Sequence, residues 1–115
     1  MTLFLGLDIG TTSTIGILIG LPDRVLAVAS RPVTLYSEQA GWAEEAPEEW
    51  WRNVTAIVPE LLARSGAAAT DIAGVGVTGM LPATVLLDRT GRVLRRAIQQ
   101  SDGRAGREVA EMRAE

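Results

Sequence analysis

Residues 6–14 read Gly-Leu-Asp-Ile-Gly-Thr-Thr-Ser-Thr and join two apolar runs, residues 3–9 and 14–21. A third apolar run, residues 25–35, follows the turn at Pro22-Asp23. Three short β-rich runs joined by tight turns predict an antiparallel meander. The runs are almost wholly apolar rather than alternating, so we expect a sheet that is covered on both faces.

The turn between the first two runs has the chemistry of an anion site. Gly10 lets the backbone turn sharply, and the amides and hydroxyls of Thr11, Thr12 and Ser13 can converge on phosphate oxygens. Asp8, at the end of the first strand, is placed to hold Mg²⁺ through water. The alternative interpretation is an ordinary hairpin, because the same residue types are common in turns everywhere.

A helix is predicted to begin at Pro47, with Glu48 and Glu49 in its first turn, where the helix dipole favours negative charge. One apolar stripe follows, made of Trp50, Val54, Ile57, Val58 and Leu61. Pro59 leaves the Thr55 carbonyl without a helical partner, so we expect a kink or an early end there, with Gly66 as the outer limit.

The remaining sequence predicts a strand over residues 72–78, then a hairpin whose arms are residues 84–87 and 93–98. A second helix is expected from Asp102, with Ala105, Val109 and Met112 on one face. This periodic pattern reaches Glu115 without a stop signal. We therefore expect the chain to be a fragment of a longer protein, or a half that needs a partner.

Composition excludes several chemistries. The 115 residues contain no Cys and no His, so there is no thiolate, no imidazole base and no His/Cys zinc site. All 11 basic residues are Arg, which excludes a P-loop lysine. The net charge of -3 argues against a nucleic-acid partner, and the absence of a long apolar run or a signal-like start predicts a cytoplasmic protein without membrane contact.

Four segments together resemble the FGGY carbohydrate kinase family, the group that includes xylulokinase and glycerol kinase. Residues 6–14 are similar to the first phosphate motif of the actin-like ATPase fold. Residues 41–51, GWAEEAPEEWW, resemble the family's Gly-Trp-x-Glu run and helix start. Residues 72–88 resemble its next core strand and hairpin, and residues 95–105, RRAIQQSDGRA, resemble the entry to its substrate loop.

The resemblance implies an α/β fold of the actin-like ATPase (ribonuclease H-like) type: a mixed sheet with an N-terminal antiparallel meander and flanking helices. Residues 1–115 would form the N-terminal part of the sugar-binding domain, and the C-terminal domain would lie outside the chain. The implied reaction transfers the γ-phosphoryl group of ATP, with Mg²⁺, to a hydroxyl of a ketose or polyol that resembles xylulose. The implied partner is a small sugar; a homodimer is left open.

The resemblance also implies roles for individual residues. Asp8 would be the metal-side carboxylate, and the ATP phosphates would be approached by Gly10, Thr11, Thr12 and Ser13. The sugar would be faced by Leu81, Pro82, Gln100 and Asp102. The family's catalytic base, an Asp, would lie beyond residue 115, so we expect no catalytic residue in this chain and no activity from the chain alone.

Departures from the family pattern favour a second reading. Ile15 stands where many relatives carry a Lys or Arg for the nucleotide phosphates, and Leu81-Pro82 replaces a polar pair such as Met-His or Arg-Glu. The alternative is therefore a non-catalytic sugar- or nucleotide-binding half of the same fold. An actin-like structural or chaperone ATPase is a third reading, but it gives no reason for the segments 41–51 and 95–105.

Two further patterns are discounted. Residues 74–79 spell Gly-x-Gly-x-x-Gly, but they fall inside a predicted strand with no helix after them, so a dinucleotide site is not expected. These glycines are instead expected to let a helix pack closely on the sheet. Arg89, Arg92, Arg95 and Arg96 surround the predicted hairpin and are interpreted as its solvated rim.

Overall fold

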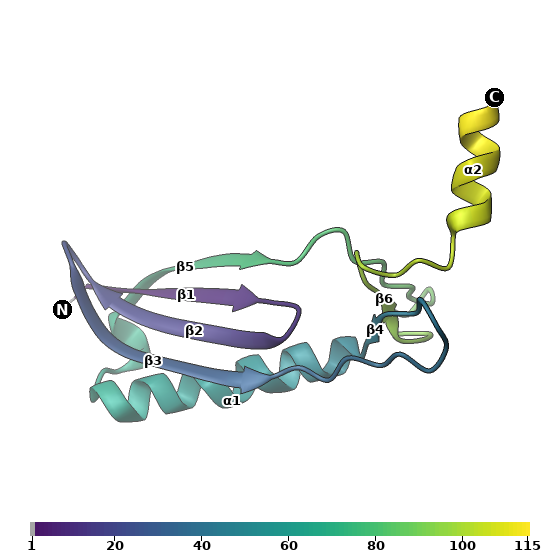
Figure 1. Ribbon diagram of the computed structural model, residues 1–115. Coiled ribbons are helices and arrows are strands. Elements are labelled where there is room, and N and C mark those ends of the chain that lie inside the picture. Colours follow the sequence, from purple (N-terminus) through teal and green to yellow (C-terminus); the bar gives the residue numbers. More distant parts are fainter. Residues whose placement is uncertain (1) are drawn as a thin grey trace. The chain divides into compact units, whose positions relative to one another are not determined.

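The computed structural model describes residues 2–115, which divide into two compact units. The first unit contains the residues up to 33 together with 48–80, and the second contains 34–47 together with 81–115. Figure 1 labels the elements of both. The backbone passes from one unit to the other three times, because each unit is built from two separate segments.

The first unit is built on a four-stranded sheet in the order β3-β2-β1-β5. Its strands are β1 (Leu3–Ile9), β2 (Ser13–Gly20), β3 (Arg24–Pro32) and β5 (Ile72–Gly79). β2 pairs antiparallel with both β1 and β3, whereas β5 pairs parallel with β1. The predicted meander and the predicted later strand are both confirmed, and together they make the sheet mixed.

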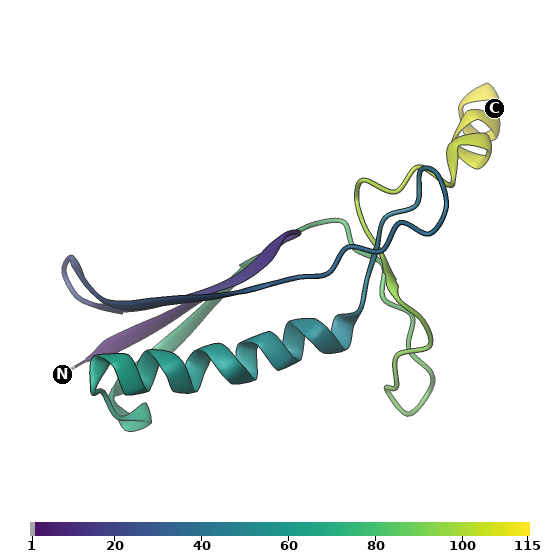
Figure 2. The same ribbon diagram turned by 60° about the horizontal axis from the view of Figure 1, so that its bottom comes forward.

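Helix α1 (Pro47–Ser65) runs along one face of this sheet (Figure 2). Alternation along each strand sends one set of side chains toward it. The buried core is made of Leu3, Leu5, Leu7, Leu18, Ala27, Ala29, Ile57 and Leu61. Within the first unit no helix packs on the opposite face, so in this unit the expectation of a sheet covered on both faces is met on one face only.

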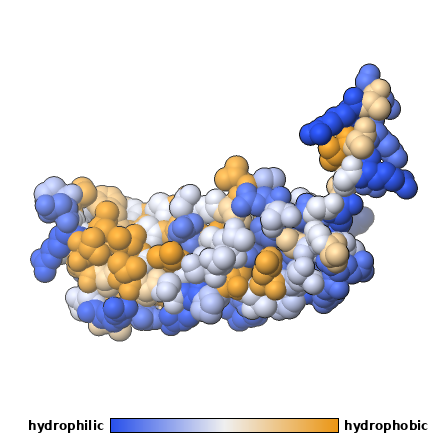
Figure 3. Space-filling model, in the orientation of Figure 1, coloured by the Kyte–Doolittle hydropathy of each residue, from blue (hydrophilic) through white to orange (hydrophobic). Residues whose placement is uncertain are grey.

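Hydrophobic surface remains on the first unit. Figure 3 shows it gathered over the strands at the left of the view. The β2–β3 hairpin exposes Leu21, Val25 and Val28, and the edge strand β5 exposes Val75 and Val77. The apolar runs in the sequence are therefore only partly accounted for by the core of this unit. No helix within residues 2–115 is both long and apolar enough to cross a bilayer.

Pro59 does not end helix α1, so of the expected kink or early end the early end is wrong; the helix continues to Ser65 and stops before Gly66, the outer limit that the sequence predicted. Proline removes one backbone hydrogen bond from a helix interior, a local cost of ~3 kcal/mol. Ile57 and Leu61, on either side of Pro59, are fully buried against the sheet. Burial of two such side chains contributes about 3–6 kcal/mol, which is enough to carry the helix past the proline.

Gly16 is the point of closest approach between the sheet and α1. A Cβ atom on Gly16 would overlap Ile57 Cγ2 and lie 3.0 Å from Leu61 Cδ1. A Cβ on Gly76 would meet nothing within 4 Å. The glycine that admits the helix is therefore Gly16 of β2, and the expectation that the glycines of residues 74–79 serve this purpose is wrong.

The second unit is a small two-stranded arrangement with a hairpin. β4 (Glu44–Glu45) pairs antiparallel with β6 (Ala97–Ile98), and isolated bridges join Tyr36 to Glu44 and Thr84 to Ile98. The predicted hairpin is present, since Leu87 bridges Val93 and the Leu94 amide donates to the Leu86 carbonyl at 2.9 Å.

The second helix, α2, spans Gly106–Ala114 and begins four residues later than Asp102, where the sequence predicted its start. The reason is a tight turn at residues 99–104. The Asp102 amide donates to the Gln99 carbonyl at 3.0 Å, and the Asp102 carboxylate accepts from the Arg104 amide at 3.0 Å. A carboxylate that binds the amide two residues ahead offers the backbone an alternative to the helix.

Candidate functional site

The turn between β1 and β2 is closed by its own backbone. The Gly10 amide donates to the Ser13 carbonyl at 3.0 Å. A Cβ atom at Gly10 would lie 2.7 Å from that same carbonyl oxygen, so a side chain there would force the turn open. Gly10 has no positive φ. The glycine is needed for space in this turn, which refines the conformational reason that the sequence suggested.

The turn also presents backbone donors. The Thr12 carbonyl accepts a hydrogen bond from the Val33 amide at 3.0 Å, which ties the turn to the end of β3. Within residues 2–115, no hydrogen bond uses the amide of Thr11 or of Thr12 as its donor. Successive amides in such a turn form a nest that binds anions. The sequence-predicted phosphate residues Gly10, Thr11, Thr12 and Ser13 are thus brought together by one turn.

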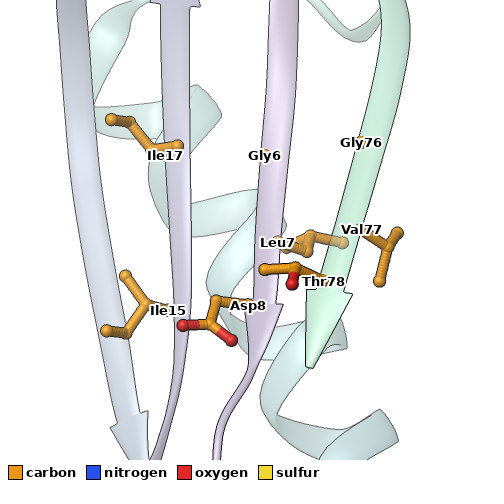
Figure 4. Close-up of a pocket in the computed structure, with 8 residues that line it drawn as sticks. All are labelled: Gly6, Leu7, Asp8, Ile15, Ile17, Gly76, Val77 and Thr78. Carbon is orange, nitrogen blue, oxygen red and sulfur yellow. The ribbon is translucent and has the colours of Figure 1, made fainter. Parts of the chain in front are cut away.

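Asp8 lies at the end of β1, two residues before this turn. It pairs in register with Ile15 on β2 and with Thr78 on β5. Figure 4 shows its carboxylate between these two neighbours, with the helix behind the strands. All three line a hollow of about 400 Å³ in the first unit, together with Gly6, Leu7, Ile17, Gly76 and Val77.

The donor set at Asp8 suits magnesium bound together with a phosphate. No group of three or more His, Cys, Asp or Glu side chains within residues 2–115 could hold a metal ion by itself. Mg²⁺ does not need three protein side chains, because it keeps several waters and is commonly held by one or two carboxylates together with substrate phosphates. Asp8, next to a turn with available amides, fits that mode of binding.

The sugar-facing residues expected from the sequence lie in the second unit. Leu81, Pro82 and Gln100 are exposed at its surface, with Leu81 keeping 76% of its accessible area. Their side chains are open to a ligand. Asp102 differs, because only 2% of its side chain is exposed.

Both carboxylate oxygens of Asp102 are engaged within the second unit. Oδ1 accepts from the Arg104 amide and from Arg104 Nε at 3.0 and 2.8 Å, and Oδ2 accepts from Arg104 Nη2 and from the Ala43 amide, both at 2.7 Å. The bidentate Arg104 guanidinium is the main reason that the pKa of Asp102 lies well below its usual range. These four donors occupy the carboxylate's acceptor positions.

Glu44 forms the centre of a neighbouring network of arginines. It is buried, and its Oε2 accepts from Arg104 Nη2 at 2.6 Å and also from Arg95. Arg96 binds Glu38 at 2.6 Å, stacks on Tyr36 and lies 3.7 Å from Glu44 Oε1. Arg95 and Arg96 therefore point inward to carboxylates, so their interpretation as a solvated rim is wrong.

Sequence reasoning missed the burial of five polar residues: Thr14, Glu44, Glu45, Asn53 and Gln99. Gln99 Nε2 donates to Glu45, and both side chains are buried. Asn53 could have been noticed, because it stands four residues before Ile57 on the buried face of α1. Glu44 is the Glu of the Gly-Trp-x-Glu run and Gln99 lies in the segment 95–105, but no local pattern states their pairings, because the partners lie more than 50 residues away.

Comparison with known proteins decides the family. The family model described as the N-terminal domain of the FGGY family of carbohydrate kinases matches residues 3–115. The chain belongs to this family. The resemblance drawn from four sequence segments is confirmed, and so is the actin-like ATPase fold expected from it.

Individual relatives in the FGGY family are similar over most of the chain. A glycerol kinase from Citrifermentans bemidjiense is 40% identical over 105 residues, and a xylulose kinase from Bacillus subtilis is 36% identical over 104 residues. Each match covers 90% of this chain and 21% of the relative. The crystal structure of xylulose kinase from Rhodospirillum rubrum has a TM-score of 0.91 and 60% identity, covering 97% of this chain and 23% of that one. The chain thus spans about a fifth of these proteins.

Proposed function

We propose that the complete protein containing this chain is an ATP-dependent kinase that phosphorylates a hydroxyl group of a ketose or polyol. The observation that carries the proposal is the pairing of Asp8 with the Gly10–Ser13 turn at the same strand ends. A carboxylate for a metal and amides for phosphate oxygens are the two features that phosphoryl transfer needs from this side of the site.

The chain's contribution to the reaction is positioning and neutralisation of charge. The Thr11 and Thr12 amides bind the terminal phosphate oxygens, and the closed turn keeps them in place. Asp8 would hold Mg²⁺, which would neutralise charge on the phosphoryl oxygens. Donors fixed before the reaction cost no reorganisation when charge develops, which is why such groups accelerate transfer.

The proposed sugar site belongs to the second unit. Leu81 and Pro82 supply an apolar wall, and the Gln100 amide supplies hydrogen bonds to a sugar hydroxyl. Asp102 is expected to act on the sugar chiefly through Arg104, because a hydroxyl at Asp102 would have to share or replace one of its four present bonds. Similarity to both xylulose and glycerol kinases supports a ketose or polyol, with xylulose favoured by the 60% identical structure.

The test is a coupled assay of ADP release by the full-length protein with ATP and a panel of ketopentoses, ketohexoses and polyols. We expect one class of sugar to stimulate ADP release. Gln100→Ala should raise KM for that sugar about two- to tenfold, the scale of one neutral hydrogen bond. Absence of sugar-dependent ADP release across the whole panel would overturn the proposal.

A second candidate function is a binding half that keeps the fold without the transfer reaction. The observation in its favour is Ile15, which lines the hollow beside Asp8, is 38% exposed and cannot contact a phosphate through charge. Titration calorimetry separates the two functions. Sugar or nucleotide binding by the full-length protein without any turnover supports the second candidate, and turnover rejects it.

A further inference from the structure

Asn53 is a polar side chain on the buried face of α1. It is 9% exposed, and its Nδ2 donates to Thr14 Oγ1 at 3.1 Å and to the Pro32 carbonyl at 3.0 Å. A primary amide nitrogen carries two hydrogens, so both of its donors are in use. Thr14 is itself completely buried.

The two acceptors flank one residue of the phosphate turn. Thr14 directly follows Ser13, and Pro32 is the residue of β3 that pairs in register with Ser13. Asn53 therefore joins β2 and β3 from the helix side at the point where the turn enters the sheet. The bond from the Val33 amide to the Thr12 carbonyl also ties the turn to the end of β3.

We infer that Asn53 is a positioning residue for nucleotide phosphates: it fixes the Gly10–Ser13 turn in the shape that presents the Thr11 and Thr12 amides. This inference rests on the proposed kinase function. A hydrogen bond weakens steeply when its angle departs from linear, so two bonds from one rigid helical residue restrict how the strand ends move. A phosphate bound by amides at 2.7–3.1 Å is sensitive to such movement.

The variants separate positioning from loss of stability. Asn53→Leu removes both donors at similar volume, and Thr14→Val removes one acceptor with little change of shape. Thr14→Ser keeps the hydroxyl. Ile57→Val is the matched control, because Ile57 lies one turn further along the same helix face, is fully buried, and packs near Gly16 of β2.

In the full-length protein, Asn53→Leu and Thr14→Val are each expected to raise KM for ATP at least about fivefold, with KM for the sugar unchanged. The double variant should be no worse than Asn53→Leu alone, because the two changes remove the same bond. Thr14→Ser, which keeps the hydroxyl, should have the wild-type KM for ATP. Ile57→Val should lower Tm and leave KM for ATP as it is.

Hydrogen exchange of the Gly10 amide, measured on the same proteins, gives a readout that needs no activity. Asn53→Leu should speed exchange at Gly10, and Ile57→Val should not. If the wild-type protein transfers no phosphate, the proposed function fails while this exchange result still decides the inference. An unchanged KM for ATP in an active Asn53→Leu protein, or equal exchange at Gly10 in both variants, overturns it. If Asn53→Leu does not fold, Thr14→Val decides by the same measurements.

Discussion

Asp8 illustrates how one side chain acquires a function from its position. It lies at the strand end beside a turn whose amides are available, and its neighbours in the sheet are Ile15 and Thr78. No ion pair within residues 2–115 uses its carboxylate, so its charge remains available to a bound cation. This is why the proposed function gives Asp8 a role in binding the metal.

We therefore predict that Asp8→Asn in the full-length protein lowers kcat at least about a hundredfold, the scale of removing one preorganised electrostatic group. Steady-state kinetics under saturating ATP and sugar measures this effect. Asp23→Asn, an exposed carboxylate in the turn between β2 and β3, is the control and should keep full activity. A near-normal kcat for Asp8→Asn would remove Asp8 from the site.

Asp102 differs from Asp8, because its carboxylate is bound by other residues of the same chain. Its pKa is lowered mainly by Arg104, helped by the backbone amides of Ala43 and Arg104. Because the folded-state pKa lies below the unfolded value of about 3.9, its stabilisation is complete above that pH and is lost as the pH falls below it.

Asp102→Asn should accordingly lower Tm at pH 7, and the difference from wild type should shrink as the pH falls below about 4. Thermal unfolding of the full-length protein at a series of pH values measures this. Glu108→Gln, at an exposed position of α2 in the same unit, provides the control. A Tm difference that stays constant with pH would show that the Asp102 charge does not contribute to stability.

At the scale of elements, the contact between α1 and β2 depends on the absence of a side chain at Gly16. Gly16→Ala is predicted to destabilise the protein by about 1–3 kcal/mol, the usual cost of overpacking a filled core. In an Ile57→Ala background, which lacks the Cγ2 atom that the new methyl group would overlap, Gly16→Ala should cost less. Gly76→Ala, where the added atom meets open space, is the control and should have a small effect.

Urea unfolding of the full-length protein measures each of these free energies. Equal destabilisation by Gly16→Ala and Gly76→Ala would mean that strand propensity, rather than the contact with Ile57, explains the glycine.

The elements show what the sequence could predict. The meander, the start of α1 and the strand over residues 72–78 followed from short-range patterns of apolar residues and turns. The continuation of α1 past Pro59 did not, because it depends on burial of Ile57 and Leu61 against strands distant in sequence. The later start of α2 depends on the Asp102 carboxylate, whose partner Ala43 is 59 residues away.

The candidate site also has one part that the sequence could predict and one part that it could not. Residues 8–13 form one local motif, so their proximity was predictable from spacing and the structure bears it out. Asn53 reaches Thr14 across 39 residues and Pro32 across 21, and no local pattern states that pairing. The role of the site in catalysis stays a prediction, as does the contact of Leu81, Pro82 and Gln100 with a sugar.

At the scale of the whole molecule, the chain spans only about a fifth of its kinase relatives, as in the 21% covered in the glycerol kinase of C. bemidjiense. Phosphoryl transfer needs a base for the attacking hydroxyl as well as charge neutralisation. The family resemblance implies that this base lies beyond residue 115. We therefore predict that the isolated 115 residues give no sugar-dependent ADP release above background in a coupled assay. Turnover by the isolated chain would contradict this.

The threefold passage of the backbone between the two units has a consequence for synthesis on the ribosome. The Gly10–Ser13 turn is synthesised before α1, and Asn53, whose amide binds Thr14, follows Thr14 by 39 residues. At about 5–20 residues per second, this leaves the turn without its helix for roughly 2–8 s. The edge of β1 that pairs with β5 stays unpaired for longer still, because β5 ends at Gly79. A nascent chain that stalls before α1 is complete would leave the apolar face of β1, β2 and β3 exposed, and partly folded chains with such exposed strands aggregate readily.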